Sequence, residues 1–138
     1  MVNVIRIDGL AEFSRNLRKL DSDLPKVLRI ALNEGADLVV HEATPPIPKR
    51  TGRAARSVKA RSTRTAVRVV AGGKRAGYFP FLDFGGRVGK NKSVRRPFLK
   101  EGRYIYPAYF RARDSGEFQQ TLSKALIDVA RQAGVVVD

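Results

Sequence analysis

Few residues in this 138-residue chain are of a type that performs catalysis. His41 is the single histidine, cysteine is absent, and no Ser, Asp or Cys pattern marks a partner for His41 in a nucleophilic triad. The lack of cysteine excludes disulfides, thiolate catalysis and zinc–thiolate sites. We expect His41 to lie near the C-terminal end of a helix, where a cation suits the helix dipole.

Two further patterns suggest chemistry but do not meet its requirements. Asp83 and Glu101 are the only acids in residues 49–113, and paired carboxylates can hydrolyse sugars, yet nothing else marks a sugar cleft. The stretch GGRVGKN is similar to a phosphate loop, but that motif requires Gly at position 84 and Ser or Thr at 91, where Phe84 and Asn91 stand. The sequence therefore predicts no enzyme, no metal site and no cofactor.

The clearest chemical signal is positive charge in the middle of the chain. The net charge is +14, and residues 49–113 hold 19 Lys and Arg but only two acids. Residues 1–48 hold six basic and seven acidic residues, and residues 114–138 hold two and four. Such a region attracts phosphates or an acidic protein surface, although a solvated face that keeps the chain soluble is the simpler alternative.

Apolar periodicity predicts the elements of the first third of the chain. Residues 2–7 alternate as a short strand, and residues 8–20 carry apolar side chains at helical spacing. A long helix should follow over residues 24–43, since Pro25 is tolerated in a first turn. Thr44-Pro45-Pro46 should end this helix, because proline restricts the preceding residue and donates no hydrogen bond.

The basic region begins with a proline-rich segment. Residues 45–56, PPIPKRTGRAAR, are predicted to form a long surface loop. Residues 58–71 alternate on either side of a turn near residues 62–64, which predicts a β-hairpin with one apolar and one basic face.

The last third combines aromatic, polar and helical segments. Residues 78–86 contain Pro80 and should form an irregular or single-turn segment that packs aromatic rings on the core. We predict a mobile polar loop over residues 87–96 and a strand over residues 103–106 that ends at Pro107. A closing amphipathic helix should run from about residue 115 to residue 132.

These elements predict an α+β fold in a single domain that spans residues 1–138. A small antiparallel β-sheet should pack against the long N-terminal helix and the C-terminal helix, with long loops between the elements. No apolar run approaches the roughly 18 residues that would span a bilayer. The N-terminus also lacks the charged and apolar regions of a secretory signal, so we expect no membrane partner.

Several short motifs occur in an order that is typical of one family. They are Thr51-Gly52, Arg56-Ser57-Val58, the spaced set Tyr78, Phe81, Asp83, Phe84 and Gly85, then Arg96-Pro97-Phe98-Leu99 and Pro107-Ala108. Over about residues 10–132 the chain resembles the head–tail joining, or tail-completion, proteins of long-tailed double-stranded-DNA bacteriophages, a group that includes lambda-like minor tail protein Z. That family commonly carries Glu where Asp83 stands and Thr where Gly86 stands.

The resemblance implies a non-enzymatic virion protein without a cofactor, assembled in the host cytoplasm. Its implied partners are further copies in a ring, for which we expect a hexamer, and neighbouring tail and head-connector proteins of the phage neck. Ring subunits need exposed, partly apolar segments that become buried on assembly. The predicted interface residues are Pro46, Ile47, Pro48, Lys49, Arg50, Thr51, Gly52, Tyr78, Phe79 and Asp83.

The basic hairpin is predicted to contact either double-stranded DNA in the lumen of the ring or an acidic partner. The candidate residues are Arg56, Lys59, Arg61, Arg64 and Arg68, because alternate hairpin positions can share one face. The main alternative function is a basic nucleic-acid-binding protein of host or phage, in which aromatic residues would stack on bases. Those residues would be Tyr78, Phe79, Tyr104, Tyr106 and Tyr109, although no recognised nucleic-acid-binding motif accompanies them.

Overall fold

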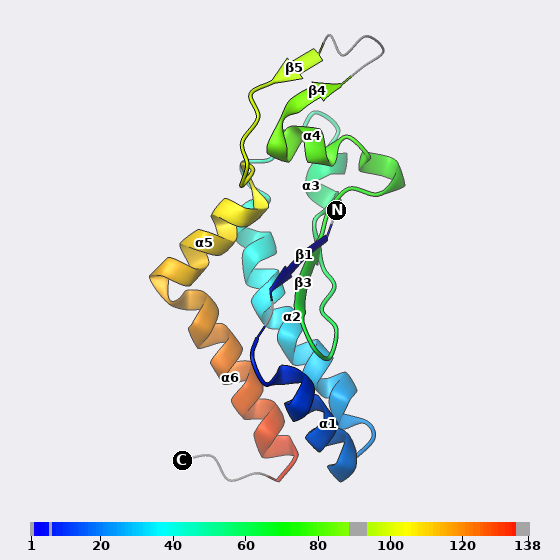
Figure 1. Ribbon diagram of the computed structural model, residues 1–138, viewed down its shortest axis with the longest axis vertical. Coiled ribbons are helices and arrows are strands. Elements are labelled where there is room, and N and C mark those ends of the chain that lie inside the picture. Colours follow the sequence, from blue (N-terminus) through cyan, green and yellow to red (C-terminus); the bar gives the residue numbers. More distant parts are fainter. Residues whose placement is uncertain (1, 6, 89–93, 135–138) are drawn as a thin grey trace.

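The computed structural model describes residues 2–5, 7–88 and 94–134 (Figure 1). In chain order the elements are β1 (Val2–Ile5), α1 (Leu10–Leu20), α2 (Leu24–Ala43), α3 (Arg53–Ser57), β2 (Lys59–Ala60), β3 (Val67–Val70), the 3₁₀ helix η1 (Lys74–Ala76), α4 (Phe79–Phe84), β4 (Gly86–Val88), β5 (Val94–Arg96), α5 (Ile105–Ser115) and α6 (Glu117–Gln132). Helices combined with small antiparallel sheets confirm the predicted α+β class.

The larger sheet is antiparallel, with the strand order β1-β3-β2. Val2 pairs with Val70 and Ile5 with Val67, while Lys59 on the other edge also pairs with Val70. Val67 and Val69 on β3 are buried, at 0% and 1% exposure. The N-terminal strand and the hairpin with one apolar face are therefore confirmed.

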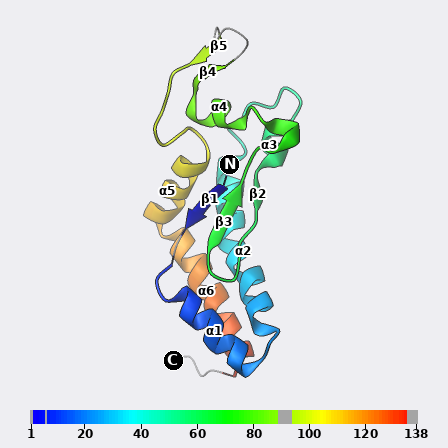
Figure 2. The ribbon, with the colours of Figure 1, turned by 45° about the vertical axis from the view of Figure 1, so that its right-hand side comes forward.

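Helix α2 is the centre of the packing (Figures 1 and 2). It contacts β2 and β3 with one face and α5 and α6 with another. Leu28 and Leu32 on α2 are completely buried. Gly35 allows α6 to approach closely, because a Cβ at this position would lie 3.2 Å from the ring of Phe118.

The prediction that both long helices lie directly on the sheet needs correction. The C-terminal helix α6 packs mainly against α2 and α5, so α2 separates most of it from the strands. The reason is the width of the buried surface of α2, which includes Gly35, Ala36 and Val39 as well as the leucines. A helix that is buried over more than one stripe must be covered on more than one side.

The strand predicted over residues 103–106 is wrong, because a helix begins at Ile105. Pro107 is the third residue of α5, where the amide has no acceptor within the helix. The proline ring would oppose the carbonyl group of Arg103, which lies before the helix. The closing helix is confirmed, and Gly116, with φ of 83°, separates α5 from α6.

Two predicted loop segments are more ordered than expected, and a third segment forms as predicted. The segment over residues 45–56 contains the start of α3 and the buried side chain of Ile47, so it is not a free loop. Residues 78–86 contain the expected short helical segment, α4. Within residues 87–96, β4 pairs with β5, and the predicted mobile centre at residues 89–93 lies outside the described residues.

Among the helices that the structure describes, none is long and apolar enough to cross a membrane.

Candidate assembly surface

Asp83 lies at the base of the projecting β4–β5 strands, and its carboxyl group is completely buried. One carboxylate oxygen, Oδ1, accepts hydrogen bonds from the backbone N–H groups of Arg103 at 2.7 Å and Tyr104 at 2.9 Å. These residues immediately precede α5, where backbone donors lack helical partners. Asp83 therefore orders the backbone that leads into α5, 20 residues before Arg103 in the chain.

Residues 79–88 and 94–104, which we call the arm, are joined by further polar contacts. The Arg103 guanidinium donates from Nη1 to the backbone oxygen of Asp83 at 3.0 Å and from Nη2 to the backbone oxygen of Pro97. The Leu99 N–H donates to the backbone oxygen of Phe84 at 2.8 Å. The segment that follows β5 is thus tied to α4 and to the start of α5.

Gly102 allows this close arrangement. It has φ of 77°, a conformation that side chains with a Cβ rarely adopt. A Cβ at Gly102 would also lie 2.6 Å from the Asp83 carboxylate. The geometry of the arm therefore requires a residue without a side chain next to the buried Asp83 carboxylate.

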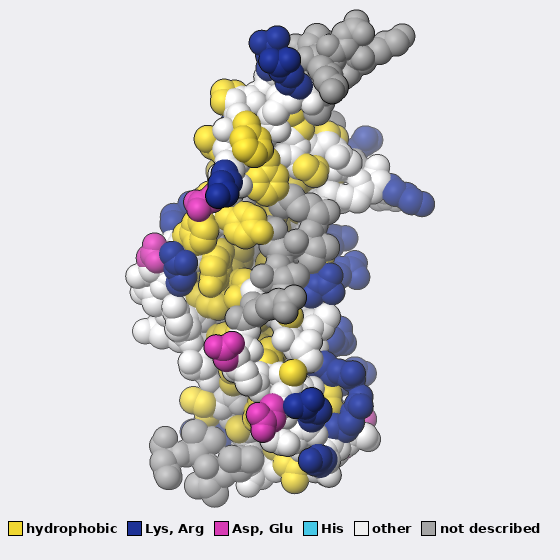
Figure 3. Space-filling model, in the orientation of Figure 1, with side chains coloured by type: hydrophobic (Ala, Val, Ile, Leu, Met, Phe, Trp, Pro, Cys, Tyr) yellow, Lys and Arg dark blue, Asp and Glu magenta, His cyan; other side chains and the backbone are white. Residues whose placement is uncertain are grey.

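The arm exposes large apolar side chains. Phe98 is 69% exposed, Val94 52% and Leu99 45%. The β4–β5 strands project from one end of the molecule, away from α1 and the end of α6 (Figure 1). Hydrophobic side chains gather over the arm and α5 in one view, whereas Lys and Arg line the other side (Figure 3). Exposed apolar groups on a projection suit contact with another protein.

A row of aromatic rings continues from the arm along α5. Phe84 packs against Tyr106 at a centroid distance of 6.4 Å, and Tyr106 stacks on Phe110 at 6.3 Å. Tyr109 meets Phe118 edge to face at 5.3 Å. These rings are half-buried or buried, and Tyr104 is only 5% exposed. The tyrosines of α5 are therefore packed within the subunit, which removes most of the predicted base-stacking surface.

The predicted interface residues fall into two groups. Ile47, Phe79 and Asp83 have 2%, 0% and 0% exposure, so these side chains support the subunit from inside. Tyr78 is 45% exposed, and Gly52 is half-buried at the start of α3. The exposed remainder of the proline segment is Pro46, Pro48, Lys49, Arg50 and Thr51.

The predicted basic residues do not all lie together. Lys59, Arg61 and Arg64 are exposed, whereas Arg68 is half-buried. The Arg61 N–H donates to the Arg68 backbone oxygen at 2.9 Å, so the two residues are direct neighbours across the hairpin. Like charges at opposed positions destabilise a sheet unless a counter-charge is near.

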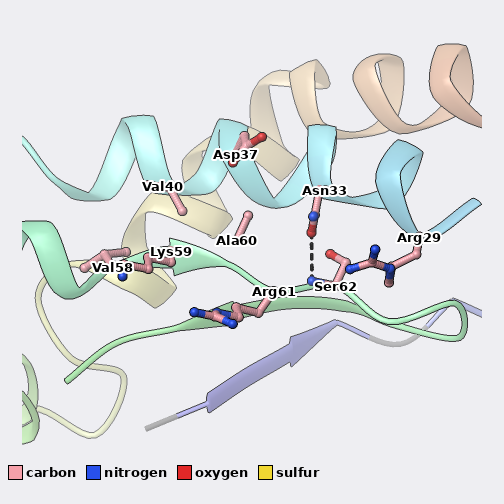
Figure 4. Close-up of a pocket in the computed structure, with 9 residues that line it drawn as sticks. All are labelled: Arg29, Asn33, Asp37, Val40, Val58, Lys59, Ala60, Arg61 and Ser62. Atoms are coloured by element: carbon pink, nitrogen blue, oxygen red, sulfur yellow. Dashed lines mark hydrogen bonds between the residues drawn. The ribbon is translucent and has the colours of Figure 1, made fainter. Parts of the chain in front are cut away.

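A hollow lies between α2 and β2, and residues of the hairpin form one of its walls (Figure 4). There Asn33 of α2 accepts a hydrogen bond from the Ser62 N–H through Oδ1 at 2.7 Å. The Ser62 hydroxyl in turn accepts from the Arg68 N–H at 3.2 Å. These polar contacts hold the hairpin on α2, and they account for the burial of Ser62 at 4% exposure.

A second, more basic hollow lies where α3, β2 and η1 meet. It has a volume of about 920 Å³ and is lined by Arg53, Arg56, Ser57, Lys59, Gly72 and Lys74. We call it the cationic hollow. Of its four basic residues, Arg56 and Lys59 were predicted, while Arg53 and Lys74 were missed. No local pattern could have found them, because 20 residues separate their positions in the chain.

Comparison with protein families adds independent evidence. The model of the bacteriophage HK97-gp10-like tail-component family matches residues 11–85, more than half of the chain. The chain belongs to this phage tail-component family. The match runs from α1 through α4 and includes the Thr51-Gly52 and Asp83–Gly85 motifs. No curated protein and no solved structure matches the chain.

The family match confirms the resemblance to head–tail joining and tail proteins. This tail component is a structural protein of the phage particle. In the described part of the chain, no group of three or more His, Cys, Asp or Glu residues is placed to hold a metal ion. Two surface features of the described residues are the apolar arm and the cationic hollow.

Proposed function

We propose that this tail component forms a homo-oligomeric ring in the phage neck or at the top of the tail and joins the tail to the head connector. In this proposal residues 1–138 form one non-enzymatic tail-completion-like domain, and the ring is a hexamer. The supporting observations are the family match and the shape of the subunit, with an apolar arm at one end. A closed ring needs two different surfaces on each subunit, and a projecting arm supplies one of them.

The observation that carries the proposal is the exposure of Val94, Phe98 and Leu99 on a segment held in place by buried polar contacts. An isolated pair of short strands is marginally stable in water, so the Asp83 contacts are needed to orient the arm before binding. Pre-organisation lowers the ordering cost of association. The arm therefore has the chemistry of an assembly element, with apolar anchors among basic residues.

The proline segment is the second proposed contact. Ile47 anchors it in the core, which leaves Pro46, Pro48 and Lys49 on the outside in a restricted conformation. Proline limits the freedom of the unbound segment, so less entropy is lost when a neighbour covers it. Tyr78 adds an exposed aromatic side chain to the surface that we propose contacts a neighbouring subunit or a neck protein.

The proposal is tested by removing the apolar character of the arm. Val94→Ser together with Phe98→Ser should leave the subunit folded, while unjoined heads and tails accumulate in infected cells. Electron microscopy of lysates counts joined and separate particles, and sedimentation of the purified protein reports ring formation. Normal joining by the folded double variant would overturn the role of the arm.

A matched control uses two exposed apolar residues at the other end of the molecule. Leu20 is 64% exposed and Ile30 is 55% exposed. Leu20→Ser together with Ile30→Ser removes a similar apolar area but should leave joining intact. Equal loss of joining in both double variants would show that general surface chemistry, and not the arm, limits assembly.

The basic region is proposed to face either the double-stranded DNA that passes through the ring or an acidic protein of the neck. Each subunit carries a net charge of +14, so copies of the chain cannot neutralise one another. An external polyanion would offset the repulsion between subunits.

A further inference from the structure

The cationic hollow combines positive charge from three separate elements. Arg53 and Arg56 come from α3, Lys59 from β2 and Lys74 from η1. Lys74 follows Arg53 by 21 residues, so the fold and not the local sequence brings these groups around one hollow. Charged groups that converge from different elements form a more specific binding surface than a single charged helix face.

The floor of the hollow is fixed by hydrogen bonds. The Ser57 hydroxyl donates to the Ala54 backbone oxygen at 2.6 Å and accepts from the Gly72 N–H at 3.0 Å. Ala54 and Ala76 are buried beneath α3 and η1, at 2% and 0% exposure. These contacts hold the two short helices side by side, so the backbones that carry the cations are positioned before any ligand binds.

Arg56 is further restrained by its own segment. Its Nη2 group donates to the Thr51 backbone oxygen at 3.2 Å, and a Cβ at Gly52 would lie 2.9 Å from its Nη1 group. The guanidinium therefore folds back over the start of α3. A restrained guanidinium loses less side-chain entropy when it binds an anion.

The charges of the hollow are not neutralised within the described part of the chain. The ion pairs found there join Arg111 to Glu42 at 4.0 Å and Arg113 to Asp114 at 3.1 Å, both outside the hollow. Among the described residues that line the hollow, none is acidic. Four cations around one space repel one another, and an anionic ligand would remove that repulsion.

The lining also indicates which kind of anion fits. Its described residues are arginine, lysine, serine and glycine, with no large apolar side chain among them. A protein partner would need apolar anchors at the centre of its interface, which the arm offers and the hollow does not. Protein–DNA interfaces are instead polar and strongly basic, and their phosphate contacts come from Arg, Lys, Ser and backbone N–H groups.

The cations continue beyond the hollow from Lys59 of β2 to Arg61, just after the strand. Lys59 and Arg61 are alternate residues on an extended segment, so their Cα atoms lie about 6.7 Å apart. This is close to twice the axial spacing of about 3.4 Å between phosphates of one DNA strand. The hairpin edge can therefore follow a phosphate backbone that enters the hollow.

We propose that the cationic hollow binds the backbone phosphates of double-stranded DNA through Arg53, Arg56, Lys59 and Lys74, with Arg61 extending the contact. This inference deepens the proposed function, on which it rests for the position of the duplex in the ring. Phosphate contacts of this kind carry no sequence information, which suits a structure that DNA of any sequence must pass.

The test measures binding of the purified full-length protein to a short fluorescent duplex by anisotropy, between about 50 and 200 mM salt. The site variant combines Arg53→Gln, Lys59→Gln and Lys74→Gln. The control variant combines Arg15→Gln, Lys26→Gln and Lys124→Gln, three exposed residues on other elements. Both variants lose the same net charge, so a difference between them reports position.

We expect the site variant to bind the duplex at least about tenfold more weakly than the control variant at low salt. Each phosphate contact contributes a slope of roughly 0.9 to the dependence of log affinity on log salt, so this slope should fall by about 2 to 3. A charge-preserving variant with Arg53→Lys, Lys59→Arg and Lys74→Arg should retain binding. Equal weakening of the site and control variants would overturn the inference, because bulk charge would then explain the affinity.

A poly-glutamate peptide is the second ligand whose binding is measured. If the site variant loses peptide binding but binds the duplex as the control does, the partner is an acidic protein and the inference is wrong. Circular dichroism melts of all variants confirm that the subunit is folded. Because binding is measured on purified protein, its outcome is independent of whether heads and tails join in cells.

Discussion

The body of this tail component, formed by β1–β3 with α1, α2, α5 and α6, is held by apolar packing, whereas the arm is held by polar contacts. In the body, Leu28 and Leu32 are completely buried, and Val39 is 1% exposed. In the arm, the central buried group is the Asp83 carboxylate, which orders backbone N–H groups of the segment that leads into α5.

Because of this difference, the residues that stabilise the subunit are largely distinct from those available for assembly. Most large apolar side chains in the body are buried in the core, so few are exposed for contact with a partner. In the arm, directional hydrogen bonds supply the order, and Val94, Phe98 and Leu99 can remain exposed. Phe79 anchors the start of the arm in the core, and the polar contacts allow the later apolar side chains of the arm to stay exposed for another protein.

The largest expected effect is in the body. Leu32→Ala should reduce the free energy of unfolding by about 2–5 kcal/mol, because it opens a cavity at a completely buried site. Urea unfolding followed by circular dichroism measures the change. Lys26→Ala, an exposed change on the same helix, should cost under about 0.5 kcal/mol. Similar losses for the two variants would contradict the placement of α2 at the centre of the core.

A smaller effect is expected at the base of the arm. Asp83→Asn keeps an acceptor oxygen but removes the charge, so the hydrogen bonds to Arg103 and Tyr104 should weaken, at a cost of about 1–2 kcal/mol. Hydrogen exchange should quicken at those two amides and remain slow in α2. Uniformly faster exchange throughout α2 would show that the arm and the body unfold as one unit.

A still smaller loss of stability is expected at the half-buried surface of α6. Leu126 on α6 is half-buried, so Leu126→Ala should cost about 1 kcal/mol, less than the same change at Leu28. Thermal unfolding of the two variants side by side gives the order of the effects. A loss at Leu126 as large as that at Leu28 would mean that α6 is covered more completely than this subunit alone provides, as by a neighbouring copy.

The smallest effect on stability is expected where the effect on assembly is greatest. Phe98→Ser should change the free energy of unfolding by less than about 0.5 kcal/mol, since the ring is 69% exposed. The same variant should weaken ring formation in sedimentation experiments. A stability loss comparable to that of Leu32→Ala would place Phe98 in the core and end the distinction between body and arm.

Local sequence patterns predict the elements whose order depends on neighbouring residues. Apolar spacing of three and four residues predicted α1, α2 and α6 to within a few residues, and alternation predicted the β2–β3 hairpin. Charge counting located the basic region, and the order of short motifs indicated the phage family that the family match confirmed. Each of these signals is contained in a short stretch of chain.

How distant segments meet depends on long-range contacts that no local pattern predicts. Pro107 was expected to end a strand, but Asp83 supplies acceptors to the residues before α5 from 20 positions away, so a helix begins there. The Ser57–Gly72 hydrogen bond likewise joins segments 15 residues apart and brings Lys74 beside α3. Such side-chain to backbone hydrogen bonds have no periodicity along the chain, and the cationic hollow and the orientation of the arm depend on them.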